Sequence, residues 1–370
     1  MKQSALPLPA RRGVLALGLL AALSCQAASP RAADTYSMAD YAKVRKFDAH
    51  VHINAKDPTF LQLARSDGFE LLTINVDYPA FPSLDTQHAA ALAQVHADPA
   101  RVHWATTFTM KGFGTPGWTE RTNAELARHV GEGAHAVKVW KNIGMVELDP
   151  AGKRVFLDDP RLSPVADQIQ KLGVPLIAHQ AEPYNCWLPL DQMSTDNDRE
   201  YFAHHPEYHM YLHPEMPTHA DLMAARDRFV AAHPGLSVVG AHMASLEYDV
   251  EVLAAFLDRY PNATVDLAAR MSQVQYQSVR DYAKVRDFFI KYQDRLIYGT
   301  DLTFQPDSKP EEFRREAHDF WTSDWQYLAT GDTQRVEMIH ADVPGLALPK
   351  TVIDKIYYAN AVRVFGTARR

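Results

Sequence analysis

His50 and His52 stand two residues apart at the end of an apolar run, a spacing that suits a metal ion. Side chains two apart on a strand point to the same side, so both imidazoles can reach one ion. His179 and His242 each end a later apolar run, and Asp301 ends the last one. Imidazoles and a carboxylate suit a divalent transition ion, with zinc favoured and manganese or iron as alternatives. The set contains no thiolate and leaves a position for water, which predicts a catalytic rather than a structural site.

Four other residues are candidates for the same site. Lys138 lies inside an apolar run, where a charge is costly without a partner. It is either a buried ion-pair partner or, once carboxylated, a bridge between two metal ions, so the sequence allows one or two ions. Glu182 is a candidate metal ligand or substrate contact, and Arg270 a candidate partner for an anionic substrate group. Trp187 is a candidate for the mouth of the substrate pocket, although a loop carboxylate, a surface ion pair and simple packing are the ordinary alternatives for these three.

The elements that must position these residues follow one repeated pattern. Eight short apolar runs alternate with stretches of helical spacing, which predicts a parallel sheet. The runs are 47–53, 71–76, 102–108, 134–140, 175–179, 236–242, 264–268 and 295–298, and the clearest helical stretches are 85–98, 123–132, 162–172, 220–233 and 250–260. Eight units over about 250 residues predict an α/β fold of the closed (β/α)8, TIM-type barrel class. The alternative, an open doubly wound sheet, lacks its glycine-rich loop after the first run.

A barrel would bring the candidate residues to one place. All its strands end at one face, where the active sites of this fold lie. Asp48 shares the strand parity of His50 and His52, so we expect it on the same face but deeper. The longest interruption, 182–219, follows the fifth run and is expected to form a functional loop. A helix over 350–365 is expected to pack across the barrel.

Four motifs together resemble the amidohydrolase superfamily, in its amidohydrolase-related branch. They are FDAHVHI, LIAHQAEP, VVGAHMAS and YGTDL, and the likeness extends over 46–366 to the closing YYANAVRVFG. The resemblance implies a distorted barrel with a C-terminal helical extension and a metal held by His50, His52, His179 and Asp301. It implies that His242 acts as an acid/base or substrate contact in one-metal members and as a second-ion ligand in two-metal members. Lys138 is similar to the bridging lysine of the two-metal members.

These features predict an exported, metal-dependent hydrolase. Water activated by the metal would attack the carbonyl of a small ester, lactone or amide, with Asp301 accepting the proton. His242 would stabilise the oxyanion or protonate the leaving atom. The alternative is a decarboxylase resembling aminocarboxymuconate-semialdehyde decarboxylase, which would need Arg270 or Arg199 in the metal pocket. A third interpretation is a binding protein that kept the barrel and lost catalysis.

The N-terminus predicts export. Lys2, Arg11 and Arg12 precede an apolar run, 14–23, that is followed by small residues, as in a cleaved signal. We therefore expect a signal peptide over 1–28, a linker or helix over 29–46 and a single barrel domain over 47–370, in the periplasm or secreted. The paired arginines allow a twin-arginine route, and Cys25 allows a lipoprotein route.

The composition limits the classes of partner that the chain is expected to bind. The chain is 46% hydrophobic and 22% charged, with a formal charge of −7 that becomes −10 if the signal's three positive charges are removed. This argues against nucleic-acid binding, which needs basic surface. No other apolar stretch approaches the length of a membrane span, so a small-molecule substrate and no membrane insertion are expected. Cys186 would be the one remaining cysteine, without a disulfide partner, and a homo-oligomer is left open.

Overall fold

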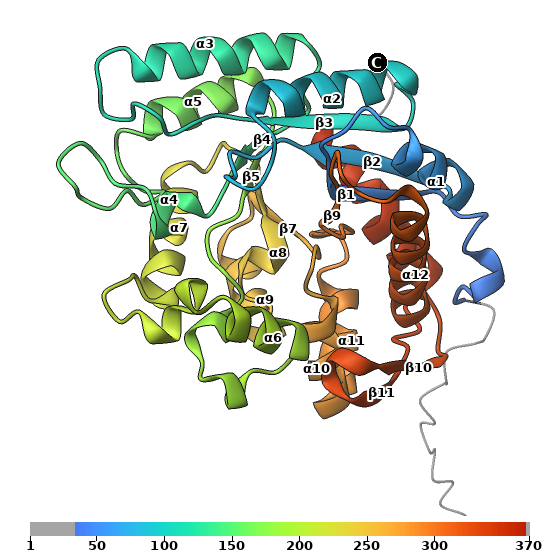
Figure 1. The fold of residues 1–370 in the computed structure, drawn as a ribbon. Helices are drawn as coiled ribbons and strands as arrows, with labels where there is room; N and C mark the ends of the chain where they lie inside the picture. Colours follow the sequence, from blue (N-terminus) through green and yellow to red (C-terminus); the bar gives the residue numbers. More distant parts are fainter. Residues whose placement is uncertain (1–33, 368–370) are drawn as a thin grey trace, which may run out of the picture. The chain divides into compact units, whose positions relative to one another are not determined.

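Nine parallel strands of the described residues form one sheet in the order β8-β7-β6-β5-β4-β3-β2-β1-β9. They are β1 (Lys46–Ile53), β2 (Phe69–Ile74), β3 (Val102–Thr107), β4 (Val137–Val139), β5 (Leu176–Ala178), β6 (Val238–Gly240), β7 (Ala263–Asp266), β8 (Leu296–Ile297) and β9 (Leu302–Phe304). In the ribbon these strands lie among the surrounding helices (Figure 1). Each of the eight predicted runs overlaps one of β1 to β8, and β1, β2 and β7 begin one or two residues before their runs.

The computed structural model describes residues 34–367. Contacts divide the chain into 1–34 and 35–370, and all the elements belong to the second unit. The predicted signal peptide, 1–28, lies outside the described residues, as do 29–33 of the predicted linker. None of the described helices is long and apolar enough to cross a membrane.

The eighth strand is broken, and its two halves close the barrel. β8 pairs with β7, whereas β9 pairs with β1. Between them, the amide of Ala49 donates to the carbonyl of Tyr298 (3.0 Å), and the amide of Asp301 donates to the carbonyl of His50 (2.7 Å). First and last strands are therefore joined, and the structure is a closed (β/α)8 barrel rather than an open sheet.

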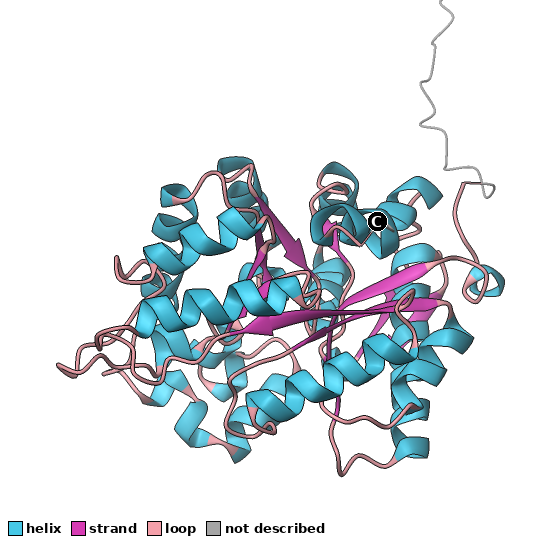
Figure 2. Ribbon diagram, turned by 90° about the horizontal axis from the view of Figure 1, so that it is seen from above, coloured by secondary structure: helices cyan, strands magenta, loops and turns pink. Residues whose placement is uncertain are grey.

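Helices surround the strands (Figure 2). They are α1 (Thr59–Asp67), α2 (Leu84–Ala97), α3 (Trp118–Gly131), α4 (Asn142–Met145), α5 (Ser163–Leu172), α6 (Asp196–His204), α7 (His219–Ala232), α8 (Ala241–Ala244), α9 (Val250–Arg259), α10 (Met271–Arg280), α11 (Tyr282–Lys291), α12 (Pro310–Ala329), α13 (Lys350–Asp354) and α14 (Asn360–Phe365). The five predicted stretches correspond to α2, α3, α5, α7 and α9. Ser83 and Thr218 cap α2 and α7 by accepting bonds from first-turn amides.

The C-terminal extension seals one end of the barrel. α13 continues through a π-helical segment, Lys355–Ala359, into α14. Ala361 and Phe365 of α14 pack in one apolar cluster with Phe47, Ile177 and other strand residues. The expected packing of this tail across the barrel is therefore confirmed.

A bulge in β1 corrects the expected position of Asp48. Asp48 pairs with Leu71 but Val51 pairs with Thr73, so β1 holds one extra residue. The bulge reverses the parity of the strand between Asp48 and His50. Asp48 therefore points toward α12, where its carboxylate accepts bonds from Thr300 Oγ1 (2.6 Å) and Trp321 Nε1 (2.9 Å).

The hairpin β10 (Thr333–Val336) and β11 (Ala341–Pro344) has no counterpart in the predicted elements. Its segments, TQRV and ADVP, are mostly exposed or half-buried, so they lack the apolar run that marks the barrel strands.

Asp324 of α12 is a buried acid below the broken strand, where it accepts a bond from the Tyr298 hydroxyl (3.0 Å). Burial raises its pKa from 3.8 to about 8. The folded protein therefore keeps a proton that the unfolded chain releases, and its free energy of unfolding falls as pH rises between these values, by at most about 1.4 kcal/mol per pH unit. We predict that Asp324→Asn removes part of this slope in urea unfolding between about pH 5 and pH 7. The exposed control, Asp307→Asn, should keep it, and identical slopes in all three proteins would contradict the prediction.

Candidate active site

The candidate residues converge on one cavity of about 230 Å³ at the carboxyl ends of the strands. Its walls come from β1, the ends of β2, β4, β5 and β6, and the broken eighth strand. They are His50, His52, Val76, Tyr78, Phe81, Lys138, Trp140, Lys141, His179, His242, Asp301 and Thr303. All five residues with predicted metal or catalytic roles, together with Lys138, are therefore in one place.

His50, His52 and Asp301 form the tightest group. Their nitrogen and oxygen atoms lie within 4.8 Å of one another, a spacing that could hold a metal ion. His52 Nε2 is 3.1 Å and His50 Nε2 is 3.5 Å from the same oxygen, Oδ1 of Asp301. A second group joins His50 and His242 to Asp266.

The far ring nitrogens of the histidines are held by fixed acceptors. Nδ1 of His50 donates to a carboxylate oxygen of Asp266 (2.9 Å), and Nδ1 of His52 donates to the carbonyl of Ile74 (2.7 Å). Nδ1 of His242 donates to the carbonyl of Ala268 (2.9 Å). Such contacts set the tautomer and leave Nε2 with its lone pair, as in metal-binding histidines.

His179 faces the same space but belongs to neither tight group of the described residues. Its ring centroid is 4.2 Å from that of His242, whose ring is in turn 4.8 Å from that of His50. Nε2 of His179 donates to the carbonyl of Ala181 (3.1 Å), which leaves Nδ1 with the lone pair. His179 would therefore bind a cation through Nδ1.

The charges of the site suit a cation. Burial lowers the pKa of His50 and holds the pKa values of His179 and His242 well below their usual value, so these rings are neutral. Burial raises the pKa of Asp301, but the surrounding imidazoles of His242, His52 and His50 outweigh it and hold the pKa well below its usual value. The result is neutral imidazoles around an ionised carboxylate.

Lys138 lies against the same group. Its Nζ is 3.2 Å from His50 Nε2, and burial lowers its pKa to about 8 despite the attraction of Asp266 and Asp301. A buried lysine of this kind is partly uncharged near neutral pH, the form that carboxylation requires. Both predicted alternatives for Lys138, a buried charge and a carboxylated bridge, fit this position.

His242 stands on a strained turn that follows β6. His242, Met243, Ala244 and Ser245 all have φ near +55°, a left-handed conformation that costs roughly 1–2 kcal/mol per residue. Gly240 permits it, because a Cβ there would lie 2.6 Å from that of Ala244. The turn accepts bonds from Arg226 at the Ala244 carbonyl and from His219 Nε2 at the Ser245 carbonyl (2.8 Å). Contacts with α7 therefore stabilise this turn, whose residues do not favour the left-handed conformation themselves.

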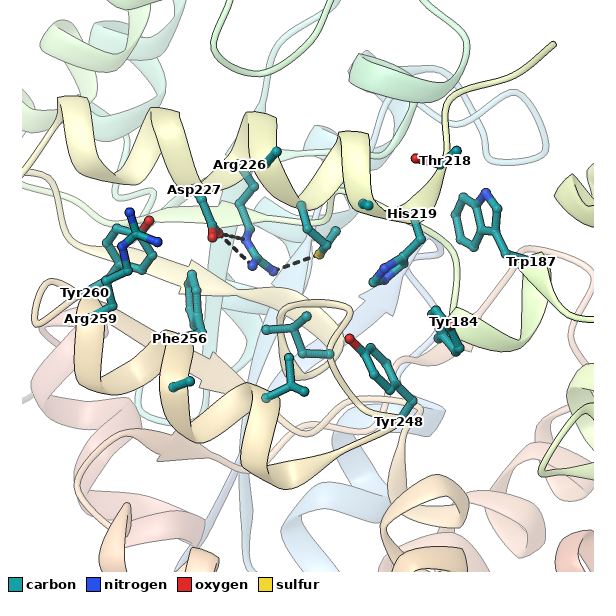
Figure 3. A pocket seen from close by; sticks show the side chains of 16 residues that line it. Tyr184, Trp187, Thr218, His219, Arg226, Asp227, Tyr248, Phe256, Arg259 and Tyr260 are labelled. Atoms are coloured by element: carbon teal, nitrogen blue, oxygen red, sulfur yellow. Dashed lines mark hydrogen bonds and ion pairs between the residues drawn. The ribbon is translucent and has the colours of Figure 1, made fainter. Parts of the chain in front are cut away.

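The predicted substrate contacts do not line the cavity of about 230 Å³ described above, which holds the candidate metal ligands and is the metal cavity of this site. Trp187 donates from Nε1 to the carbonyl of Pro217 (3.2 Å) and lines a different cleft, of about 800 Å³ between α7 and α9 (Figure 3). Glu182 pairs with Lys141, and it is Lys141 that lines the cavity. The expectation that Trp187 lines the mouth of the metal pocket is therefore wrong, because the 182–219 segment folds that ring against α7.

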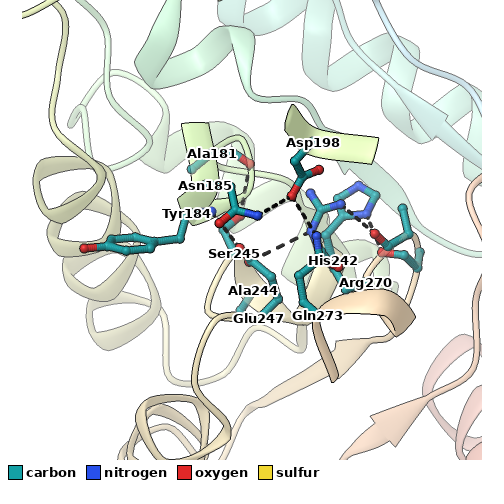
Figure 4. Close-up of polar contacts among 12 residues, drawn as sticks. Ala181, Tyr184, Asn185, Asp198, His242, Ala244, Ser245, Glu247, Arg270 and Gln273 are labelled. Carbon is teal, nitrogen blue, oxygen red and sulfur yellow. Dashed lines mark hydrogen bonds and ion pairs between the residues drawn. The ribbon is translucent and has the colours of Figure 1, made fainter. Parts of the chain in front are cut away.

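Arg270 lies close to His242 but does not itself line the cavity (Figure 4). It is buried, with Nε 3.9 Å from Oε2 of Glu247, and it is not among the described residues that line the metal pocket (Figure 4). The buried carboxylate of Glu247 attracts it. The predicted contact of Arg270 with an anionic substrate group stays a prediction.

The long 182–219 segment is anchored beside Arg270 by buried polar contacts. Asp198 of α6 accepts bonds at Oδ2 from Asn185 Nδ2 (2.7 Å) and Gln273 Nε2 (2.9 Å) (Figure 4). The amide of Tyr184 donates to Oε1 of Glu247 (2.6 Å). The segment is therefore tied to α10 and to the turn after β6.

Sequence reasoning missed Asp266, Lys141 and the aromatic wall formed by Tyr78, Phe81 and Trp140. Asp266 had a usable signal, because it is an acid inside the seventh of the apolar runs, and in the structure it ends β7. The aromatic residues had no recognisable sequence signal, since similar residues occur throughout the loops.

A parallel barrel with imidazoles and a carboxylate gathered at the carboxyl ends of its strands defines an enzyme of the (β/α)8 class. Within this class, the chain belongs to the amidohydrolase family, whose model, described as Amidohydrolase, matches residues 47–367. None of the curated proteins compared with the chain matches it.

Several solved structures are similar to the chain at low sequence identity. A 2,6-dihydroxybenzoate decarboxylase in complex with 2,6-dihydroxybenzoate is 17% identical over 87% of this chain and 99% of its own, with a TM-score of 0.50. A probable 2-pyrone-4,6-dicarboxylic acid hydrolase from Acinetobacter baumannii is 12% identical over 87% and 99%, with a TM-score of 0.49. A lactonase from Listeria monocytogenes is 9% identical over 89% and 96%, with a TM-score of 0.42.

Asp266 provides a test of the metal site. We predict that Asp266→Asn lowers Zn²⁺ affinity about 10–100-fold, because His50 loses the carboxylate that orients its ring. Equilibrium dialysis with zinc, followed by elemental analysis, measures the change. Asp258→Asn, an exposed acid on α9, is the control and should bind zinc like the unmodified protein. Equal affinity of the Asp266 variant would remove this residue from the site.

Proposed function

We propose that this protein is a metal-dependent hydrolase that cleaves an ester, lactone or amide of a small molecule. The observation that carries the proposal is the group of His50, His52 and Asp301, two imidazoles and an ionised carboxylate that face one cavity. Family membership supports an enzyme of this kind.

The residues present fit a divalent cation. His50 and His52 would bind it through Nε2, Asp301 through Oδ1 and His179 through Nδ1, since the opposite ring nitrogens are already used. We propose zinc, because nitrogen donors with one carboxylate suit it best; one or two ions fit, depending on Lys138. When bound, the cation would supply a polarised carbonyl and a water that ionises near neutral pH.

Asp301 is placed to move the proton. Its side chain is 35% exposed, the rest being packed among the imidazoles, so one carboxylate edge faces the cavity. It would accept a proton from the attacking water and return it to the leaving group, a step typically worth about 10²–10⁴-fold.

His242 is placed to accept a proton or bind a cation rather than to donate. Its Nδ1 proton is used by the Ala268 carbonyl, so Nε2 of the neutral ring holds a lone pair. This favours a ligand or base role over the oxyanion donor suggested by sequence.

Decarboxylation is the second candidate, and the cationic Lys141 on the cavity wall is the observation that favours it. However, Lys141 is paired with Glu182, and Arg270 faces Glu247. Arg199 is held by Asp196 and the Met193 carbonyl. Neither arginine reaches the cavity, so hydrolysis fits better. Carbon dioxide release from carboxylated substrates would identify the decarboxylase.

We predict that Asp301→Asn leaves the fold intact and lowers kcat at least about 100-fold, since the amide cannot accept the proton. Hydrolysis of a panel of esters and lactones by the zinc-loaded protein, with circular dichroism as the folding check, measures this. Asp307→Asn, a change at an exposed acid that follows β9, should keep full kcat. An Asp301 variant with unchanged kcat would refute the assigned role.

We further propose that the chain is exported and that its first 28 residues are removed. Expressed in a Gram-negative bacterium, the periplasmic protein should have an intact mass that corresponds to cleavage near Ala28. The double variant Arg11→Lys/Arg12→Lys should still be exported by the ordinary secretory route, whereas loss of export would indicate the twin-arginine route. A full-length protein confined to the cytoplasm would contradict the proposal.

A further inference from the structure

A second cavity adjoins the candidate active site. It measures about 510 Å³ and shares Asp301 and Thr303 with the metal cavity, so the carboxylate proposed to move the proton lines both spaces. A substrate held at the metal cavity therefore has a place for a further substituent on the side of the broken eighth strand.

Most of the lining surface of this second cavity is apolar. Met271 begins α10, Leu302 lies on β9, Phe320 on α12, and Val336 and Met338 belong to the hairpin segment. Phe320 is 37% and Met338 is 47% exposed, so both offer contact area that no protein neighbour covers. Four separate elements thus bring apolar side chains to this second cavity, which forms an apolar groove.

The groove carries no positive charge. Among the described residues that line it there is no lysine, arginine or histidine, and the acids are Asp301 and Asp324. Burial raises the pKa of Asp324 to about 8, so that side chain is uncharged near neutral pH. A carboxylate or phosphate placed here would lose its hydration and meet no cation.

The outer wall of the groove is fixed rather than free. The turn of the hairpin is tied to α6 by His340, whose Nε2 lies 2.5 Å from Oδ2 of Asp196. Asn197, the next residue of α6, itself lines the groove. The hairpin and the 182–219 segment are therefore held together over this space.

We propose that this groove binds an uncharged alkyl chain of the substrate, so that the enzyme prefers neutral esters or lactones with a medium-length apolar chain. This inference rests on the proposed hydrolysis. Water oxygen bonds to the acyl carbon, the bond to the alkoxy oxygen breaks, and that oxygen takes the proton. The chain remains in the groove while the carbonyl stands at the metal cavity.

Chain length tests the preference. For the zinc-loaded protein, kcat/KM for methyl octanoate or octyl acetate should exceed that for methyl butyrate by at least about tenfold, because each buried methylene favours binding. Met338→Glu, a change at a half-exposed position, should remove most of this preference, because it puts a carboxylate where the alkyl chain would lie. Phe320→Ser, a change on α12, should also remove most of this preference. Val146→Glu, which adds the same carboxylate at a position that is 64% exposed and outside both cavities, should keep the preference.

Binding of octanol separates this inference from the proposed function, because octanol has no acyl group to hydrolyse. Calorimetric titration should show binding that Met338→Glu weakens at least about fivefold and that Asp301→Asn retains. If octanol binds in this way but no ester is hydrolysed, the proposed role of the groove is supported and the proposed hydrolysis is refuted. If esters are hydrolysed without a chain-length preference, and octanol binding does not depend on Met338, the groove is refuted and the hydrolysis stands.

Discussion

The seam between the first and the broken eighth strand is the constraint on which the rest of the site depends. One hydrogen bond, from the amide of Asp301 to the carbonyl of His50, places the carboxylate beside the imidazoles. Gly299 makes the approach possible, because a Cβ there would lie 2.9 Å from the Cβ of His50. The φ of +70° at Asp301 then turns its side chain toward His52. Closing the barrel and assembling the metal site are therefore the same event.

Keeping this arrangement costs free energy that the surrounding structure offsets. The left-handed turn at His242 and the positive φ of Asp301 are unfavourable for residues with a side chain. Asp266 supports the turn at His242, since one of its oxygens accepts from the backbone amide of His242 (2.7 Å) while the other accepts from His50 Nδ1 (2.9 Å). A single buried carboxylate thus fixes a ring and a strained backbone together, which explains why strain is concentrated where geometry matters for chemistry.

What the sequence could predict follows from how each feature is encoded. The strand-end positions of His50, His179 and Asp301 were predictable, because each ends an apolar run and all parallel strands end at one face. The bulge that turns Asp48 to α12 was not, since it depends on pairing with β2 rather than on local residues. The orientation of Arg270 depends on Glu247, more than twenty residues earlier, and likewise carries no local pattern.

The two halves of the site answer different physical demands. Proton transfer needs groups fixed to within a fraction of an ångström. His50 stands on the fully buried strand β1, and Asp301, between β8 and β9, is tied to it by the bond from its amide to the His50 carbonyl. Selection of a substrate needs only shape and polarity, and the groove is built from a hairpin and helix ends that can vary without disturbing the barrel. Because Asp301 lines both cavities, a change in the groove would alter which carbonyl compound the proposed hydrolase accepts while leaving the proposed proton acceptor in place. The proposed carbonyl chemistry and the proposed chain preference would therefore be separable properties of one fold.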